Sequence, residues 1–157
     1  MLRGLVARVV FVGRRIVEII IEGTPRPQGS KRHVGNGIMV ESSKHVADWR
    51  NWVRLKASQA MKEQRCEVIQ KPLPVFVTIT FGFDRPKKHF RSNGELKPDA
   101  PVYHTGKPDV DKLLRAVLDA MTGIVFVDDS QVQCGRLSKV YCKAAETQIH
   151  IIFGANV

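Results

Sequence analysis

The chain has 157 residues, of which 43% are hydrophobic, and a formal net charge of +10 at pH 7. That length suits one domain with a sizeable core. The positive charge predicts a polyanionic partner, either nucleic acid or an anionic membrane surface. We expect no membrane partner, because the sequence has no long apolar stretch and no clear lipidation signal. Cys66, Cys134 and Cys142 are odd in number and lack metal-type spacing, which indicates a reducing, cytosolic compartment.

The N-terminal segment, residues 1–15, mixes apolar side chains with four arginines. Arg8 interrupts the apolar stretch and no small-residue cleavage site follows, so we do not expect a secretory signal peptide. We interpret this segment as a basic leader, either a flexible or strand-pairing extension or an over-extended start, and place a single domain at residues 16–157. Residues 16–21 are β-branched except for Glu18, which predicts a largely buried strand.

A loop rich in glycine and proline follows at residues 23–37. It carries Arg26, Lys31 and Arg32, which can offer charge to a phosphate backbone beside the loop's own amides. It lacks the spacing of a nucleotide-binding Walker loop. DNA binding and a simple solvated basic turn are the two interpretations of this loop.

A helix and a strand make up the next part of the chain. Ser43 can cap a helix that runs to about Met61, with Val46, Trp49, Val53, Ala57 and Ala60 on one face. Strict alternation from Val75 to Phe83 then predicts a strand with one well-covered face, which we expect to lie centrally in a sheet.

Residues 84–107 form a long irregular stretch with many basic side chains. Loops of this length are usually functional or disordered. This loop leads directly into an acidic segment, so we expect it to clamp DNA through Lys87, Lys88, Arg91 and Lys107. His89 and His104 have no second ligand at a typical spacing and are interpreted as ordinary loop histidines.

The acidic segment, residues 107–131, holds five of the fifteen acidic residues of a basic chain. Pro108 suits a helix entry, Asp109 is a good cap residue, and leucine, valine and methionine recur at helical spacing as far as Met121. Gly123 ends that helix, and a short apolar run at residues 124–127 leads to a second acidic pair, Asp128 and Asp129. If the apolar run returns beside the helix, both acidic pairs converge on one point.

Several carboxylates brought together repel one another unless a cation neutralises them. Magnesium is usually bound by one or two carboxylates together with waters and substrate phosphate, whereas a calcium cage needs an EF-hand-like loop that is absent here. The carboxylates of the acidic segment therefore indicate phosphate chemistry with Mg²⁺, or with Mn²⁺. The alternatives are ordinary ion pairs among Asp111, Arg115 and Asp119 on one helix face, and a simple turn at residues 128–130.

After this segment, residues 132–141 and 147–153 alternate as two strands around a turn at residues 143–146, which predicts a C-terminal hairpin. The element order is strand, helix, strand, helix, strand, strand. It predicts one α/β-type domain of mixed α+β character, with a small mixed sheet packed against helices.

The run Lys-Pro-Asp-x-Asp-x-Leu-x-(basic)-x-x-x-Asp-Ala-x-x-Gly-Ile-x-x-x-Asp-Asp-x-Gln-Val at residues 107–132 resembles the signature of the RusA family of Holliday junction resolvases, found in bacteria and their phages. Weaker similarity extends over residues 16–153. Two positions depart from the family pattern: Lys112 replaces the usual Asn, and Arg115 replaces the usual Lys. Arginine does not deprotonate in a protein, so this departure argues against a general-acid role for Arg115 but not against charge stabilisation of a phosphate.

The resemblance implies a RusA-like homodimer that cuts branched, four-way DNA without an organic cofactor. It implies DNA-facing residues in the loop at residues 23–37 and a further phosphate contact at Lys139. The expected reaction is magnesium-dependent phosphodiester hydrolysis by paired symmetric nicks. We expect a site made of the metal ligands Asp109, Asp111, Asp128 and Asp129, the catalytic cation Arg115, and Lys112 facing the phosphate. The alternatives are a metal-independent nucleic-acid-binding module and a metal-dependent nuclease that acts on flaps or RNA.

Overall fold

The computed structural model describes residues 11–29, 31–33, 39–41 and 45–156. None of the helices in these ranges is long and apolar enough to cross a membrane. The elements in chain order are β1 (Phe11–Glu22), β2 (Lys31–His33), β3 (Met39–Glu41), α1 (Val46–Glu63), β4 (Val75–Asp84), the 3₁₀ turn η1 (Lys87–His89), α2 (Val110–Met121), the 3₁₀ turn η2 (Asp129–Gln131), β5 (Val132–Cys142) and β6 (Glu146–Asn156).

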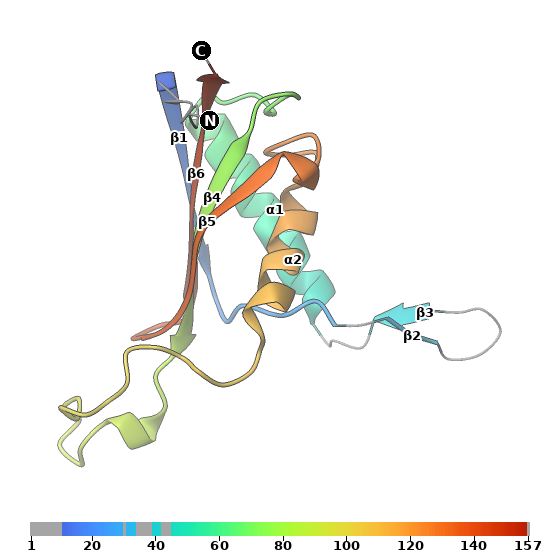
Figure 1. Ribbon diagram of the computed structural model, residues 1–157. Helices are drawn as coiled ribbons and strands as arrows, with labels where there is room; N and C mark the ends of the chain where they lie inside the picture. Colours follow the sequence, from blue (N-terminus) through green and yellow to red (C-terminus); the bar gives the residue numbers. More distant parts are fainter. Residues whose placement is uncertain (1–10, 30, 34–38, 42–44, 157) are drawn as a thin grey trace, which may run out of the picture.

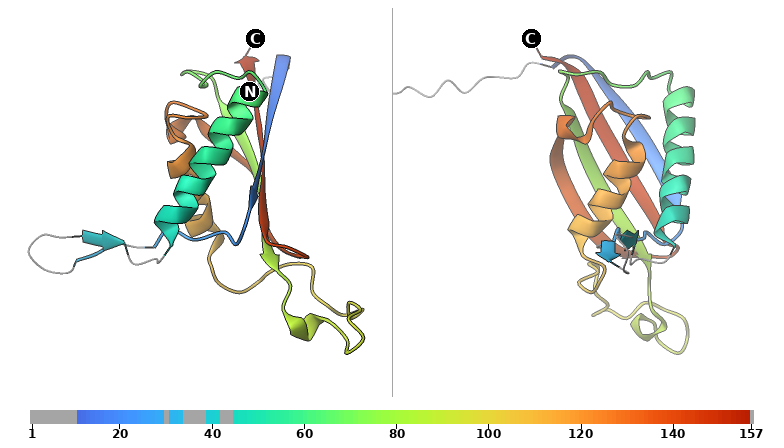
Figure 2. Two further views of the ribbon diagram at one scale, coloured as in Figure 1. Left: turned by 180° about the vertical axis from the view of Figure 1, so that it is seen from behind. Right: turned by 90° about the vertical axis from the view of Figure 1, so that its right-hand side faces the viewer.

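The main sheet has four strands in the order β1-β6-β4-β5. Strands β4 and β5 are parallel, whereas β6 is antiparallel to both of its neighbours. Both helices cover the same face of this sheet, and in the described part of the chain the opposite face carries no helix (Figure 2). The predicted class, a small mixed sheet packed against helices, is confirmed.

The core lies between the sheet and the helices. Its residues follow the alternation expected of strands and the 3.6-residue spacing expected of helices. Every second residue of β4 from Val75 to Phe83 is buried, as the alternation predicts. Helix α1 buries the predicted face, Val46, Trp49, Val53, Ala57 and Ala60, together with Met61. Its N-cap residue is His45 instead of the predicted Ser43, which lies outside the described residues. The two periods therefore fix which side of each element faces the core.

The predicted hairpin between the last two strands is wrong. β5 and β6 are both strands, but β4 lies between them and pairs with each. The connection from β5 to β6 crosses over β4 at Gly82, where a Cβ atom would lie 2.7 Å from the carbonyl oxygen of Glu146. Glycine permits this close approach because it has no side chain. Alternation along a strand predicts its faces but not its neighbours, so this order could not be read from the sequence.

The N-terminal strand starts earlier than predicted. β1 begins at Phe11, and Arg15 pairs with Phe153 on β6, so part of the predicted leader belongs to the sheet. The division between a leader and a domain at residues 15 and 16 stays a prediction. Of the cysteines, Cys66 and Cys142 are free thiols in accord with the prediction, whereas the side chain of Cys134 lies outside the described residues.

Two segments extend from one end of the molecule (Figure 1). One contains β2 and β3, which pair antiparallel, and comes from the predicted basic loop. The other is residues 85–106, which we call the basic arm. Helix α2 begins at this same end and runs toward the opposite one, as both figures show. The fold therefore places the start of α2 between two extensions.

Candidate active site

The first acidic pair lies at the start of α2. Asp109 is the N-cap residue and Asp111 is in the first turn, and both are exposed. Anionic groups are favoured there by the unpaired amides and dipole of the helix. Among the described residues, Asp109 makes no side-chain capping bond, and its Oδ2 lies 3.3 Å from Nζ of Lys112. Two accessible carboxylates two residues apart at a helix start are a donor set that suits Mg²⁺ bound jointly with substrate phosphate.

Two contacts hold the chain as it enters this helix. Nζ of Lys139 on β5 donates to the carbonyl oxygens of Gly106 and Pro108, at 2.6 and 2.8 Å. From the other side, the backbone amide of Gln28 donates to the carbonyl oxygen of Lys112 at 3.0 Å. The Lys139 ammonium, predicted to contact DNA, is therefore hydrogen-bonded to the protein's own backbone. The loop after β1 lies against the first turn of α2.

A cleft of about 620 Å³ opens beside Asp109, between the loop after β1 and the segment that enters α2. Its walls include Phe83 at the end of β4 and the prolines of both loops. Three predicted DNA-binding residues, Arg26, Lys107 and Lys112, also line it. The fold thus brings basic residues from two separate parts of the chain to one acidic site, which is an arrangement suited to a phosphate backbone.

Arg115 lies one turn beyond Asp111 on α2 and is exposed. The ordinary interpretation, an ion pair with Asp111 or Asp119, is not realised: within the described part of the chain Arg115 has no carboxylate partner within 4.0 Å. Lys112, by contrast, pairs with Asp109. The Arg115 guanidinium is therefore available to an anionic ligand beside the acidic pair.

The expectation that the two acidic pairs converge within one chain is wrong. The run at residues 124–127 does not return along α2 but pairs with Ile69, whose amide donates to the carbonyl oxygen of Val125 at 2.8 Å. The turn η2, which Asp128 precedes and Asp129 begins, therefore follows the far end of α2; the chain leaves α2 at that end (Figure 1). The 12 residues of α2, at about 1.5 Å each, give the helix a length of about 18 Å, and this helix lies between the two pairs. Accordingly, no three acidic, histidine or cysteine side chains within the described ranges are close enough to hold a metal ion.

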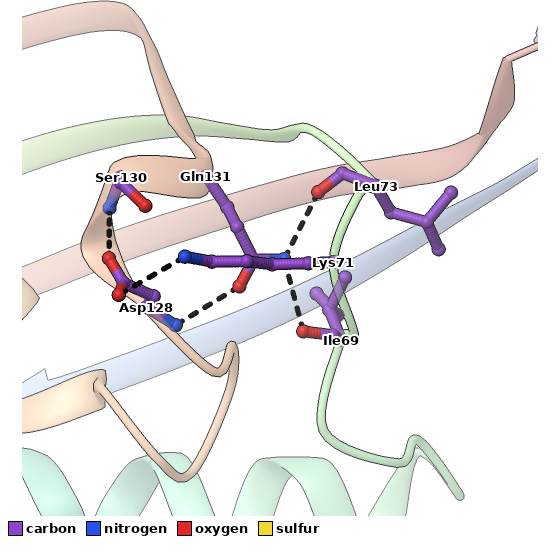
Figure 3. Close-up of polar contacts among 6 residues, drawn as sticks. All are labelled: Ile69, Lys71, Leu73, Asp128, Ser130 and Gln131. Atoms are coloured by element: carbon purple, nitrogen blue, oxygen red, sulfur yellow. Dashed lines mark hydrogen bonds and ion pairs between the residues drawn. The ribbon is translucent and has the colours of Figure 1, made fainter.

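Asp128 is engaged in a local network that fixes this far turn (Figure 3). Its Oδ1 accepts from the amide of Ser130 at 2.8 Å and its Oδ2 lies 3.2 Å from Nζ of Lys71. Gln131 completes a capping box by accepting from the amide of Asp128 at 3.0 Å. The hydrogen bonds from Ser130, with Lys71, lower the pKa of Asp128 from 3.8 to about 2.

Gln131, which is buried, ties this network to the chain before β4. Its Nε2 donates to the carbonyl oxygens of Ile69 and Leu73, at 3.2 and 3.1 Å. Asp129, next to the network, is exposed. The two neighbouring acids therefore differ: Asp128 is bound by protein groups through both oxygens, whereas the Asp129 side chain faces solvent.

The basic arm is anchored at its base by an aromatic cluster. His104 stacks on Phe83 with ring centroids 4.3 Å apart, and His89 meets Tyr141 edge-on at 4.8 Å. Burial, with Arg85 nearby, lowers the pKa of His89. Both histidine rings thus pack against aromatic side chains, in accord with their interpretation as ordinary loop histidines.

The predicted DNA contacts of the two extensions lie outside this cluster. Lys87, Lys88 and Arg91 are exposed on the arm, and Arg91 lies 3.7 Å from Glu95. The backbone of Lys31 and Arg32 forms β2, but their side chains lie outside the described residues. Arg26 is exposed at the cleft.

Sequence reasoning missed three residues that shape the site. Phe83 was assigned only to a core-facing strand, Gln28 was not considered, and Lys71 was not connected with the second acidic pair. Each acts through a partner that is distant in sequence, so no local pattern marks it. The proline content of residues 23–37 was the available signal for a rigid wall of the cleft.

Two comparisons bear on this site. Residues 21–152 match the family model described as "Endodeoxyribonuclease RusA". The chain is also 27% identical to the "Uncharacterized protein YqaN" of Bacillus subtilis (strain 168), over 86% of this chain and 94% of that protein. The family match contains the acidic pairs, Arg115, Lys139 and the whole basic arm.

Proposed function

This chain belongs to the RusA family of endodeoxyribonucleases, and on that premise we propose that it is a magnesium-dependent resolvase that nicks four-way DNA junctions at symmetric positions. The observation that carries the proposal is the position of Asp109 and Asp111 at the start of α2, beside a basic cleft and between two extensions. A metal-independent binding module has no need of exposed carboxylates facing a polyanion, because they would weaken binding.

Asp109 and Asp111 would hold the metal, with Mn²⁺ as a substitute for Mg²⁺. When bound, the metal would activate water and stabilise charge on the scissile phosphate. The chain's own cations supply the rest of the electrostatics: Arg115 would offset charge that develops on the phosphate oxygens, while Lys112 stays close to Asp109. Arg115 acts here as a fixed charge, since it does not exchange protons.

Asp129 enters the proposal through a second copy of the chain. Within one subunit the length of α2, about 18 Å at about 1.5 Å per residue, lies between Asp129 and the first pair. Two α2 helices that run antiparallel across a two-fold axis would place the start of one beside the end of the other. We therefore propose a homodimer in which each site combines Asp109 and Asp111 of one subunit with Asp129 of its partner. Asp128, which Ser130 and Lys71 already bind, would stabilise that turn more than it ligates metal.

Subunit complementation tests the shared site. Asp111→Asn and Asp129→Asn subunits are each expected to be inactive alone. Mixed by co-refolding, they form heterodimers in which one site carries both changes and the other carries none, so nicking of one strand should return. If each subunit instead contained a complete site, the mixed dimers would stay inactive, and the shared-site proposal would be rejected. Wild type mixed with Asp111→Asn should nick one strand and leave the junction unresolved.

Substrate choice separates the proposed function from the alternatives. Cleavage is measured on four-way junctions, flaps, continuous duplex and RNA, with Mg²⁺ or Ca²⁺. We expect paired nicks in junctions with Mg²⁺, and binding without appreciable cutting in Ca²⁺, whose looser coordination orients water poorly. Asp111→Asn should bind junctions as well as wild type or better but not cut them, because a metal ligand and a negative charge are both removed. Faster cutting of flaps or RNA would identify a different nuclease, and metal-independent binding without cutting would identify a binding module.

The remaining parts of the proposal concern partners and place of action. The arm residues Lys87, Lys88 and Arg91, with Arg26, Lys31 and Arg32 on the other side, would contact DNA phosphates. The enzyme would act in the cytosol of a bacterial host and need no organic cofactor. The free thiols of Cys66 and Cys142 are compatible with that compartment.

A further inference from the structure

We propose that the cleft beside Asp109 is a nucleotide-binding pocket that receives one unstacked base from the branch point of the DNA. This inference rests on the proposed function, because it assumes that the junction's backbone runs past the acidic pair. It goes beyond that function by naming how a branched substrate is distinguished from continuous duplex. It also places a determinant of sequence preference next to the scissile phosphate.

The composition of the cleft fits the two halves of a nucleotide. Its apolar surface comes from the ring of Phe83 and from Pro25, Pro27 and Pro108, all of which are flat or rigid groups against which a base can stack. Its basic lining comes from Arg26, Lys107 and Lys112, which suit a phosphate. A volume of about 620 Å³ lies within the range of pockets that hold small ligands.

Phe83 has the geometry of a stacking platform. It is 7% exposed, and one side of its ring already stacks on His104 with an interplanar angle of 23°. A base in the cleft would contact the part of this ring that lines it. The ring cannot turn freely, because it is largely buried and stacks on His104. A platform held this firmly requires little ordering when a ligand binds.

The position of the cleft connects it with substrate shape. Asp109 lines the cleft, so a base held there belongs to a nucleotide close to the phosphate at the metal ligands. A base at a branch point lacks a continuous stack, so taking it out costs little, whereas a base inside a continuous duplex must be unstacked and unpaired first. The cleft would therefore favour junctions without reading the shape of the whole four-way structure.

A cycle that combines protein variants with abasic DNA tests the pocket. Junctions are prepared with a single abasic nucleotide at each position within four of the branch point, and affinity is measured in Ca²⁺, so that the result does not depend on cleavage. With wild type, loss of the pocketed base should weaken binding by about five- to a hundredfold at one position, the range for loss of one base–aromatic stack. With Phe83→Leu, the same abasic junction should bind no worse than the intact one.

Two controls make the outcome specific. Phe81→Leu alters the same strand at a fully buried ring away from the cleft, so it should keep the abasic effect seen with wild type. Thr24→Trp fills the cleft from the loop side and should remove the abasic effect although Phe83 itself is unchanged. Ser58→Trp, on the exposed side of α1, should leave the abasic effect as in wild type. Thermal unfolding checks that each variant is folded.

The experiment has two outcomes. An abasic effect at one position that disappears in Phe83→Leu and Thr24→Trp but persists in Phe81→Leu and Ser58→Trp supports the pocket. No abasic effect at any position, or the same effect in all variants, rejects it. Failure of the proposed function is a separate result: wild type would then not nick junctions in Mg²⁺, while the binding cycle could still be read.

Discussion

Lys139 donates from Nζ to the carbonyl oxygen of Pro108 at 2.8 Å, and so connects the middle of β5 to the residue just before Asp109. The same ammonium binds Gly106, and the Lys139 carbonyl oxygen accepts from the amide of His104. One residue of a rigid strand therefore holds three points of the segment that leads into the acidic pair. Supporting contacts of this kind fix the geometry of a catalytic group that they do not touch.

The first prediction follows from this contact. Lys139→Met keeps the length of the side chain but removes the charge, so the start of α2 should become less fixed. We expect cleavage to fall by about ten- to a hundredfold, the range for loss of a supporting residue of a metal site, and the Mg²⁺ concentration for half-maximal rate to rise. Junction affinity in Ca²⁺ and its salt dependence should stay near wild type. A flatter salt dependence with an unchanged Mg²⁺ requirement would instead make Lys139 a phosphate contact.

The second prediction concerns Arg115, whose guanidinium has no carboxylate partner within 4.0 Å in the described ranges. If it stabilises charge on the phosphate, Arg115→Ala should lose about a hundredfold or more in single-turnover rate. Arg115→Lys should keep much of the activity. Thermal unfolding of both variants serves as the control. Wild-type cleavage by the alanine variant would show that the charge is not used.

The third prediction concerns pH and Asp128, whose pKa is about 2 in the folded protein. A carboxyl with a depressed pKa stabilises the fold above its unfolded pKa and loses this effect as pH falls through its folded pKa. Asp128→Ala should therefore lower the free energy of unfolding at pH 7. The difference from wild type should shrink below pH 3.8 and be smallest near pH 2. Urea unfolding at several pH values measures this, and a difference that grows toward low pH would contradict it.

The fourth prediction concerns the basic arm, where Lys87, Lys88 and Arg91 are exposed. Each side chain bound to a phosphate releases counterions, so neutralising all three should flatten the slope of log affinity against log salt by about one unit for each phosphate interaction removed. A control that neutralises Arg54, Lys62 and Arg65, which are also exposed but lie on α1 and just after it, should leave the slope near wild type. Equal slopes for the two triple variants would show that the arm does not bind DNA specifically.

Local features of the chain were predicted well because their causes are local. Asp109 occupies the N-cap position of α2, although its side chain makes no capping bond there, and Gly123, with a φ of 81°, follows the helix end, as the sequence indicated. The alternation in β4 and the helical spacing in α1 also identified their buried faces. These properties depend on neighbours within a few residues, so composition and spacing are sufficient to predict them.

Contacts between distant residues were decided only by the tertiary structure. β4 lies between β5 and β6, with Gly82 in close contact with Glu146, and the run that leads to the second acidic pair pairs with Ile69 instead of returning along α2. Lys139 looks like any exposed lysine in the sequence, yet the carbonyl oxygens of Gly106 and Pro108 bind it. The sequence by itself determined which residue types carry the chemistry. Only packing of the whole chain decided which of them meet, because non-local pairing leaves no periodic signal along the chain.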